Sequence, residues 1–228
     1  MGSNVDPIVN ILNSLLSKNL PAINQALRGA IVGNNLDPLR SVASGSDTLG
    51  HIDLGICTAS ASANYYVANL TGLSSFSIQS LAITGASPVH DQPNAVSGTL
   101  ALNASVGGMG AHVGGSFKAG CGFISQSVGI SGSVSINSAS VASGGDFIAT
   151  TSGGEVSITY LDVEGLSLTY QGLSVSIDGL GIFNKFLSPL EDLIIGQFQG
   201  SIRSAIAGAI TPVINTQLAK LVPLTAPL

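Results

Sequence analysis

The residue types that carry out most enzyme chemistry are few in this chain, and they do not form reactive groups. The three histidines, His51, His90 and His112, stand far apart in the sequence. Asp53 lies near His51 and Asp91 follows His90, but two ligands alone do not close a metal site. We therefore predict no metal site, and we expect these histidines in solvated loops and at strand edges.

Other catalytic patterns are equally weak. Asp162 and Glu164 would share one face of a strand, as the paired carboxylates of acid–base catalysis do, but the flanking Leu161 and Leu166 indicate a solvated outer edge instead. The glycines at 107–110 lack the strand before and the helix after that a phosphate-binding loop needs. No Gly-x-Ser-x-Gly nucleophile elbow occurs. The sequence thus predicts no enzyme, no catalytic residue and no cofactor.

The two cysteines, Cys57 and Cys121, leave two alternatives open. They lie far apart without a Cys-x-x-Cys pair, which makes them a poor metal or redox site. Either they form a disulfide between strands, worth about 2–4 kcal/mol in an oxidising compartment, or they are two buried thiols. Asn69 and Asn103 each begin an Asn-x-Ser/Thr sequon, a glycosylation signal whose occupancy the sequence leaves open.

The composition excludes several classes of protein. Charged residues make up 8% of the 228 residues, against about 25% in a typical protein. Seven Lys and Arg and a net charge of −5 provide no basic face, so we predict no nucleic-acid partner. The hydrophobic fraction of 45% argues against disorder. Because the polar surface must consist of Ser, Thr, Asn and Gly, a composition more usual outside the cell, we expect a secreted, extracellular protein.

Residues 4–44 have the pattern of a helix. Asp6-Pro7 supplies a cap residue followed by Pro at the first helical position, and Gly33 with two asparagines after it ends the helix. Pro21 should kink the helix, and Asp37-Pro38 is expected to start one further short turn. The apolar residues recur at steps of three and four, as on one helix face: Ile8, Ile11, Leu12, Leu15, Leu16, Leu20, Ile23, Leu27 and Ile31.

Residues 188–222 predict a second, longer helix. Ser188 and Glu191 have the spacing of a capping box. From 189 to 221 the helix would be about 50 Å long, with a bend at Pro212. Its apolar stripe runs without a break, so the helix must have a long apolar partner.

The middle zone, residues 48–180, supplies that partner. Apolar and Ser/Thr/Gln positions alternate, as in antiparallel strands with one buried face. A one-residue slip between Ile78 and Leu81 suggests a β-bulge, and the many glycines let the strands bend strongly. Since no helix separates these strands, βαβ units are excluded. We predict an α+β fold: a long, strongly curved antiparallel sheet wrapped around the two terminal helices.

The chain is expected to form a single domain over residues 4–228. No internal stretch has the character of a linker. Residues 1–3 have the appearance of an initiator and a vector-derived remnant ahead of a mature start at about Asn4.

Two stretches and the overall layout resemble a known superfamily. Residues 69–78 (Asn-Leu-Thr-Gly-Leu-Ser-Ser-Phe-Ser-Ile) resemble the takeout and mite-allergen strand with Gly-Leu-Ser before an aromatic residue. Residues 179–187 resemble the approach to the C-terminal helix in the same proteins. The layout is similar to the tubular lipid-binding superfamily, which includes insect takeout and juvenile-hormone-binding proteins, dust-mite group-7 allergens and the palate–lung–nasal/latherin group. The wide cysteine spacing departs from takeout proteins and is nearer to the palate–lung–nasal group.

The resemblance implies that an apolar or amphipathic ligand binds, without catalysis, in an elongated cavity between the helices and the sheet. The alternative is that the inward side chains are plain core. Because so many inner residues are small, we predict that the roll is not filled completely and that a ligand is held by area and shape. The residues expected to line this cavity are Phe76, Ile78, Leu100, Leu102, Phe117, Phe123, Ile136, Phe147, Ile158, Tyr160, Leu168, Val175, Phe183, Phe186 and Phe198.

Two functions fit these expectations. The first is a secreted carrier of a hydrophobic small molecule, such as a lipid, an isoprenoid or a carotenoid-like pigment, bound by burial of apolar surface. The second is a surfactant, foam or coat protein whose amphipathic helices open at an air–water or lipid surface, with transient membrane contact. An antimicrobial protein that binds anionic lipid would need a cationic surface, which the negative net charge disfavours.

Overall fold

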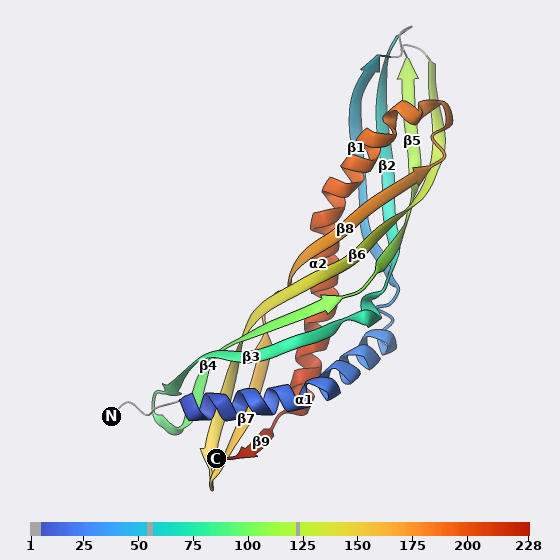
Figure 1. Ribbon diagram of the computed structural model, residues 1–228. Coiled ribbons are helices and arrows are strands. Elements are labelled where there is room, and N and C mark those ends of the chain that lie inside the picture. The colour runs from blue at the N-terminus through green and yellow to red at the C-terminus, as the bar shows by residue number, and fades with distance from the viewer. Residues whose placement is uncertain (1–5, 54–56, 122–123) are drawn as a thin grey trace.

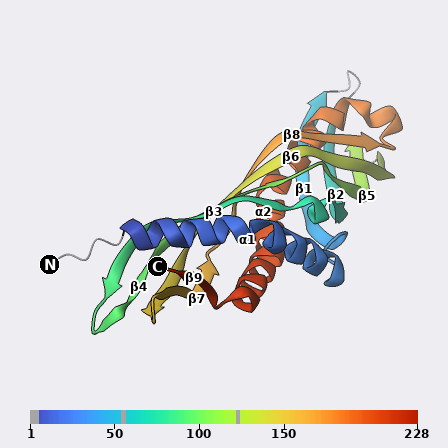
Figure 2. The same cartoon turned by 60° about the horizontal axis from the view of Figure 1, so that its bottom comes forward.

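The computed structural model describes residues 6–53, 57–121 and 124–228 as an elongated molecule in which two helices lie along one long sheet (Figure 1). The start of α1 and the C-terminus lie at the same end of the molecule (Figures 1 and 2). The elements are α1 (Asp6–Gly33), β1 (Leu39–Asp53), β2 (Thr58–Thr71), η1 (Leu73–Ser75), β3 (Ser77–Val89), β4 (Gln92–Val106), β5 (Met109–Cys121), β6 (Ile124–Ser152), β7 (Glu155–Val163), β8 (Ser167–Asp178), η2 (Gly181–Phe186), α2 (Leu187–Leu221) and β9 (Leu224–Pro227), where η denotes a 3₁₀ helix. The predicted α+β roll is confirmed.

Strand β6 is the spine of the sheet. It has 29 residues, and within the described ranges it pairs with four of the other strands of a nine-stranded antiparallel sheet. Its first half lies between β5 and β8, and its second half between β4 and β7. The sheet therefore has two halves that share strand β6. Their strand orders are β1-β2-β5-β6-β8 and β3-β4-β6-β7-β9.

Two glycines show why this strand can coil so strongly. A Cβ at Gly132 would meet the carbonyl oxygen of Ser176, and a Cβ at Gly145 would meet the carbonyl oxygen of Asp162. Each glycine thus lets a neighbouring backbone approach more closely than any other residue would allow. One of these approaches is to β8 and the other to β7, so both halves of the sheet depend on a glycine of β6.

Helix α1 ends where the sequence predicts. It runs from Asp6 to Gly33, and Asn35 after it adopts a left-handed conformation with φ 54°. Five residues of the predicted stripe are fully buried, and Pro21 lies inside the helix. The ribbon changes direction near the middle of the helix, as the expected kink requires (Figure 1).

The expected short turn at Asp37-Pro38 is wrong. Strand β1 starts at Leu39, nine residues earlier than the strand zone predicted from the pattern. The Asp37 carboxylate instead accepts the backbone N–H groups of Gly72 at 3.0 Å and Ser74 at 2.7 Å. Both N–H groups lie at the start of η1, which is distant from Asp37 in the sequence. The local sequence around Asp37 therefore does not by itself determine the role of this residue.

Helix α2 starts two residues before the predicted position, and the predicted capping box is wrong. Residue Ser188 lies inside the helix, and no side chain caps its start. The reason is that η2 runs directly into α2: the backbone N–H of Leu187 already bonds to the carbonyl of Asn184. The remaining extent agrees with the prediction, with Pro212 inside the helix and the end at Leu221.

The buried stripe of α2 winds around the helix. From Leu190 to Ile210 the buried residues recur every fourth position, and each such step advances about 40° around the axis. The five steps turn the buried face through about 200°. The N-terminal half can therefore face β1 and β8 while the C-terminal half faces β7, all of which α2 contacts. The buried residues are Leu190, Ile194, Phe198, Ile202, Ile206, Ile210, Val213, Ile214 and Leu218.

The interior of the described part of the chain is almost entirely apolar, with the buried hydroxyls of Tyr170 and Thr211 as exceptions. Its buried residues form one hydrophobic cluster along the molecule, and no polar or charged residue is buried. Helix α1 packs on β3 and β9, at the two edges of one half of the sheet, and α2 packs on β1 and β8, at the two edges of the other. Each helix therefore closes one half of the roll.

A disulfide joins Cys57 and Cys121, with 6.1 Å between their Cα atoms. It ties the start of β2 to the end of β5, so the alternative of two buried thiols is dropped. Strand β9 has no counterpart in the sequence predictions. It pairs with β7 only because the roll leaves that edge of β7 open, and four residues carry too little pattern to reveal it.

Candidate ligand-binding site

The predicted cavity residues lie mostly deep in the core. Val175 is half-buried against the same cluster, and Phe123 lies outside the described residues. The buried members, all 9% exposed or less, are Phe76, Ile78, Leu100, Leu102, Phe117, Ile136, Phe147, Ile158, Leu168, Phe183, Phe186 and Phe198. None of them lines any of four surface pockets of the described residues, and their contact with a ligand stays a prediction.

The inward assignment of Tyr160 is wrong. Its side chain is 46% exposed. The register between β6 and β7 shifts between Ile148 and Ala149, so Tyr160 pairs with Ile148 while Ile158 pairs with Ala149. The extra residue, Thr159, breaks the alternation, and burial resumes only at Leu161.

Three of the predicted aromatic residues fill one end of the roll. The ring of Phe117 on β5 lies 5.2 Å from that of Phe186 and 5.5 Å from that of Phe183, centroid to centroid. Both tilted pairs have the geometry of favourable aromatic contacts. They attach η2, and with it the start of α2, to the end of the sheet.

Asparagine side chains attach the helices to open sheet edges. The amide of Asn24 accepts the backbone N–H of Ile78 at 2.7 Å and donates to the carbonyl of the same residue at 2.9 Å. The amide of Asn13 bonds in the same way to Ile83, at 2.7 and 3.3 Å. An asparagine amide carries one acceptor and a donor, so it substitutes for the missing neighbouring strand.

The two asparagines of α1 match the spacing of β3. Eleven helical residues rise about 16.5 Å, and five strand residues span about 16.5 Å. Ile78 and Ile83 are five residues apart, which in a regular strand would turn their backbone groups toward opposite edges. The register shift between Ile78 and Ser80 restores the same orientation. The bulge that the sequence predicted is therefore confirmed, and it lets one helix bond to both positions.

A third bridge attaches α2. The amide of Asn215 accepts the N–H of Val163 and donates to its carbonyl, both at 2.9 Å. Val163 lies on the edge of β7 beyond the four residues that β9 covers. We refer to Asn13–Ile83, Asn24–Ile78 and Asn215–Val163 as the asparagine bridges. These bridges were not predicted from the sequence, although a polar residue next to a helical apolar stripe is a signal that indicates such a contact.

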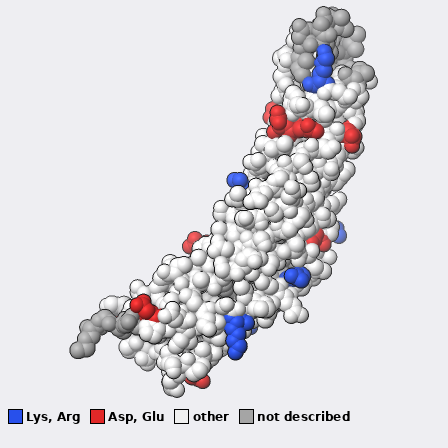
Figure 3. Space-filling model, viewed as in Figure 1, with Lys and Arg blue, Asp and Glu red and all other residues white. Residues whose placement is uncertain are grey.

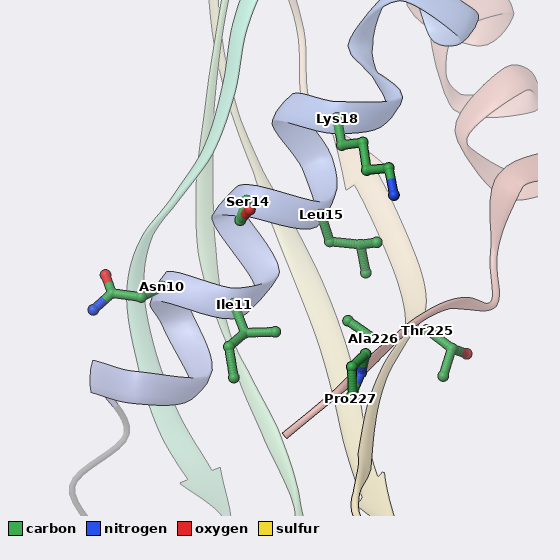
Figure 4. Close-up of a pocket in the computed structure, with 8 residues that line it drawn as sticks. All are labelled: Asn10, Ile11, Ser14, Leu15, Lys18, Thr225, Ala226 and Pro227. Carbon is green, nitrogen blue, oxygen red and sulfur yellow. The ribbon is translucent and has the colours of Figure 1, made fainter.

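A groove lies where α1 meets β9, away from the side of α1 that the asparagine bridges attach to β3. We call it the α1–β9 groove; its volume is about 460 Å³. The side chains of Ile11, Leu15 and Lys18 extend from the helix on the side of β9 (Figure 4). The lining residues are Asn10, Ile11, Ser14, Leu15, Lys18, Thr225, Ala226 and Pro227.

A second groove, of about 760 Å³, lies between α2 and β1. It is lined by Val42 and by Gly196, Gln197, Gly200, Ser201, Ser204 and Ala205 of α2. A Cβ added at either of the two glycines would meet no atom within 4 Å, so the absence of side chains there leaves this groove open. Each helix thus has an open groove along one edge of its half of the sheet.

The contact of α2 with β8 contains an unpaired hydroxyl. The guanidinium carbon of Arg203 lies 5.7 Å from the centroid of the Tyr170 ring. The Tyr170 hydroxyl is buried and has no hydrogen-bond partner among the described residues. Burial raises the pKa of Tyr170 well above its usual range, and the positive charge of Arg203 lowers the pKa by a smaller amount.

The described residues contain no group of three or more His, Cys, Asp or Glu side chains that would hold a metal ion. His90 and Asp91 form an exposed ion pair at 2.8 Å. Asp162 is half-buried and Glu164 is exposed. Charged side chains are sparse on the face shown in Figure 3. Among the helices of the described part, none has a stretch long and apolar enough to cross a bilayer.

Comparison with solved structures finds proteins of similar fold, among them the following two. The crystal structure of lipopolysaccharide binding protein has a TM-score of 0.38 and 14% identity over 91% of this chain. This chain spans 40% of that protein's chain. Takeout 1 of Epiphyas postvittana has a TM-score of 0.42 and 13% identity. The match covers 90% of this chain and 91% of the Takeout 1 chain.

The fold is similar to that of these two proteins. Takeout proteins are one of the groups that the sequence resembles. At these identities the similarity concerns the fold alone. No protein-family model matches the chain, and no curated protein matches it.

Proposed function

We propose that this protein is a secreted, non-enzymatic carrier of a hydrophobic small molecule. The observation that carries the proposal is the apolar interior: a single hydrophobic cluster runs through the described roll without a buried polar residue. An interior of this kind offers a ligand area and shape and few directional bonds. Transfer of apolar surface from water, at about 25 cal/mol per Å², then drives binding.

The two open grooves support a route to this interior. Two asparagine bridges attach α1 to β3, and the α1–β9 groove leaves the side of the helix that faces β9 open. The helix can move away from β9 while its bonds to β3 persist. The ligand then contacts the residues predicted from the sequence, and α1 returns against β9 after entry.

The disulfide supports the secreted location. Disulfides form and persist in oxidising compartments and are rare in the cytosol. The bond between Cys57 and Cys121 is consistent with export. The sparse charge fits the same location.

Ligand binding is tested in two steps. Protein from its natural source is extracted with organic solvent, and the extract is analysed by mass spectrometry and by its absorption spectrum. Recombinant protein is then titrated with the neutral fluorescent probe N-phenyl-1-naphthylamine. We expect a stoichiometric apolar compound in the extract and saturable probe binding that an unlabelled isoprenoid alcohol displaces. An empty extract together with no saturable probe binding overturns the proposal.

A second candidate is an interface-active protein. The observation that favours it is that, within the described residues, the polar bonds between helices and sheet are chiefly the three asparagine bridges. Helices held in this way can open and place their apolar faces on an air–water or lipid surface. A surface balance tests this function. A surface tension no lower than that of an ordinary globular protein at equal concentration eliminates it.

A further inference from the structure

The α1–β9 groove has a polarity gradient along α1. Ile11, Leu15 and Lys18 follow one another at steps of four and three, so they form one row along the helix. The row is about 10 Å long. It extends from α1 on the side of Ala226 and Pro227 (Figure 4). The groove is thus apolar along most of the row and ends in an ammonium group.

Lys18 has no carboxylate partner in the described part of the chain. The ion pair found there joins His90 and Asp91, far from this groove in the sequence. The chain has only 7 Lys and Arg among 228 residues, so a free ammonium beside an apolar groove is an uncommon feature of its surface. The methylene groups of a lysine pack on apolar surface while its ammonium stays in water.

We propose that the α1–β9 groove binds an anionic single-chain amphiphile, with its head group at Lys18 and its alkyl chain along Leu15 and Ile11. This inference rests on the carrier function proposed above and specifies its ligand class. The ammonium donates to the anionic head, and the chain covers apolar surface that is otherwise in contact with water. The exposed hydroxyl of Ser14, one helical turn before Lys18, lines the same groove and offers a further hydrogen bond to the head.

The test compares three ligands with the same alkyl chain: dodecanoate, dodecyl phosphate and dodecan-1-ol. Isothermal titration calorimetry measures their affinities for the wild-type protein and for Lys18→Gln. Lys220→Gln, at the last turn of α2 and outside the groove, is the matched charge control. An exposed ion pair changes affinity by up to about fivefold. We expect Lys18→Gln to weaken dodecanoate and dodecyl phosphate about threefold to fivefold, with dodecan-1-ol unchanged and Lys220→Gln without effect.

A second variant tests the place of the alkyl chain. Ala226→Phe adds a ring at a half-buried position of β9 that lines the groove, and we expect it to weaken all three ligands. Circular dichroism checks that this variant is folded, because Ala226 also packs against the core. A stronger response to one anionic head than to the other identifies carboxylate or phosphate as the preferred source of the charge.

The possible failures are distinguishable. If Lys18→Gln binds both anions as the wild type does, the head-group assignment is wrong, while undiminished dodecan-1-ol binding leaves the carrier function standing. If Ala226→Phe leaves all affinities unchanged, the ligand lies elsewhere and the groove assignment is wrong. If none of the three ligands binds the wild-type protein, the inference fails, and the carrier function is then decided by the solvent extract and the probe titration.

Discussion

The side-chain amide of Asn24 and the backbone of Ile78 form a two-bond bridge between a helix and the open edge of a sheet, with bonds of 2.7 and 2.9 Å. A free edge carries unpaired N–H and C=O groups that invite pairing with another chain. In this protein, asparagines satisfy such groups at three edge positions and attach both helices to the sheet by the same bonds.

Loss of this bridge should destabilise the protein measurably. Asn24→Leu keeps the approximate size of the side chain but leaves the N–H and C=O of Ile78 unpaired beneath α1. We expect the free energy of unfolding to fall by about 1–3 kcal/mol, measured by urea denaturation. Asn19→Ala is the control, because Asn19 bonds only to Leu15 within its own helix. Equal stabilities of Asn24→Leu and Asn19→Ala would contradict the role of the bridge.

The glycines of β6 provide a sharply matched pair of variants. In Gly145→Ala the new methyl meets the carbonyl of Asp162, whereas in Gly144→Ala the nearest contact is a Glu164 carboxylate oxygen at 4.0 Å. We expect Gly145→Ala to lower the free energy of unfolding by about 1–3 kcal/mol, while Gly144→Ala stays within about 0.5 kcal/mol of the wild type. Thermal denaturation followed by circular dichroism measures both. Similar losses for the two neighbours would show that the close approach of β6 and β7 does not require glycine.

The unpaired hydroxyl of Tyr170 predicts a substitution that stabilises the protein. Tyr170→Phe removes a buried oxygen that has no partner and keeps the ring beneath Arg203. We expect the free energy of unfolding at neutral pH to rise by about 1 kcal/mol. A loss of similar size would instead reveal a hydrogen bond that this hydroxyl makes in solution.

The same tyrosine predicts a pH dependence. Burial raises the pKa of Tyr170 above the ordinary value of 10.0, so above about pH 10 the unfolded chain releases a proton that the folded protein keeps. Stability from this group is therefore complete below pH 10 and declines as the pH rises further. Denaturant titrations at pH 9 to 11 should show a steeper decline for the wild type than for Tyr170→Phe. Parallel declines would contradict the raised pKa.

Phe147 tests whether the predicted interior residues contact the ligand. It lies fully buried in the second half of β6, and Phe147→Leu removes part of the ring at a cost smaller than truncation to Ala. We expect weaker binding of N-phenyl-1-naphthylamine with the fold retained, as judged by circular dichroism. Tyr160→Leu, at an exposed position outside the core, is the control and should leave affinity unchanged. Unchanged affinity for Phe147→Leu would mean that the ligand does not reach this part of the interior.

Regular, repeated patterns made much of the fold predictable from the sequence. Five members of the α1 stripe are buried, and the helix ends at Gly33 as the glycine and the two asparagines after it indicate. The bulge after Ile78 follows from a slip in a two-residue alternation. These features depend on residues close together in the chain, where helix and strand periods directly determine which side chains share a face.

Other features depend on segments that are distant in sequence. Tyr160 faces outward because β6 imposes a register shift on β7, and β9 exists because β7 offers it an open edge. Lys18 adjoins a groove only because the last residues of the chain return against the first helix. Periodicity assigns a face to each residue, but the partner of an open sheet edge is decided by which backbone groups the folded chain brings within bonding distance.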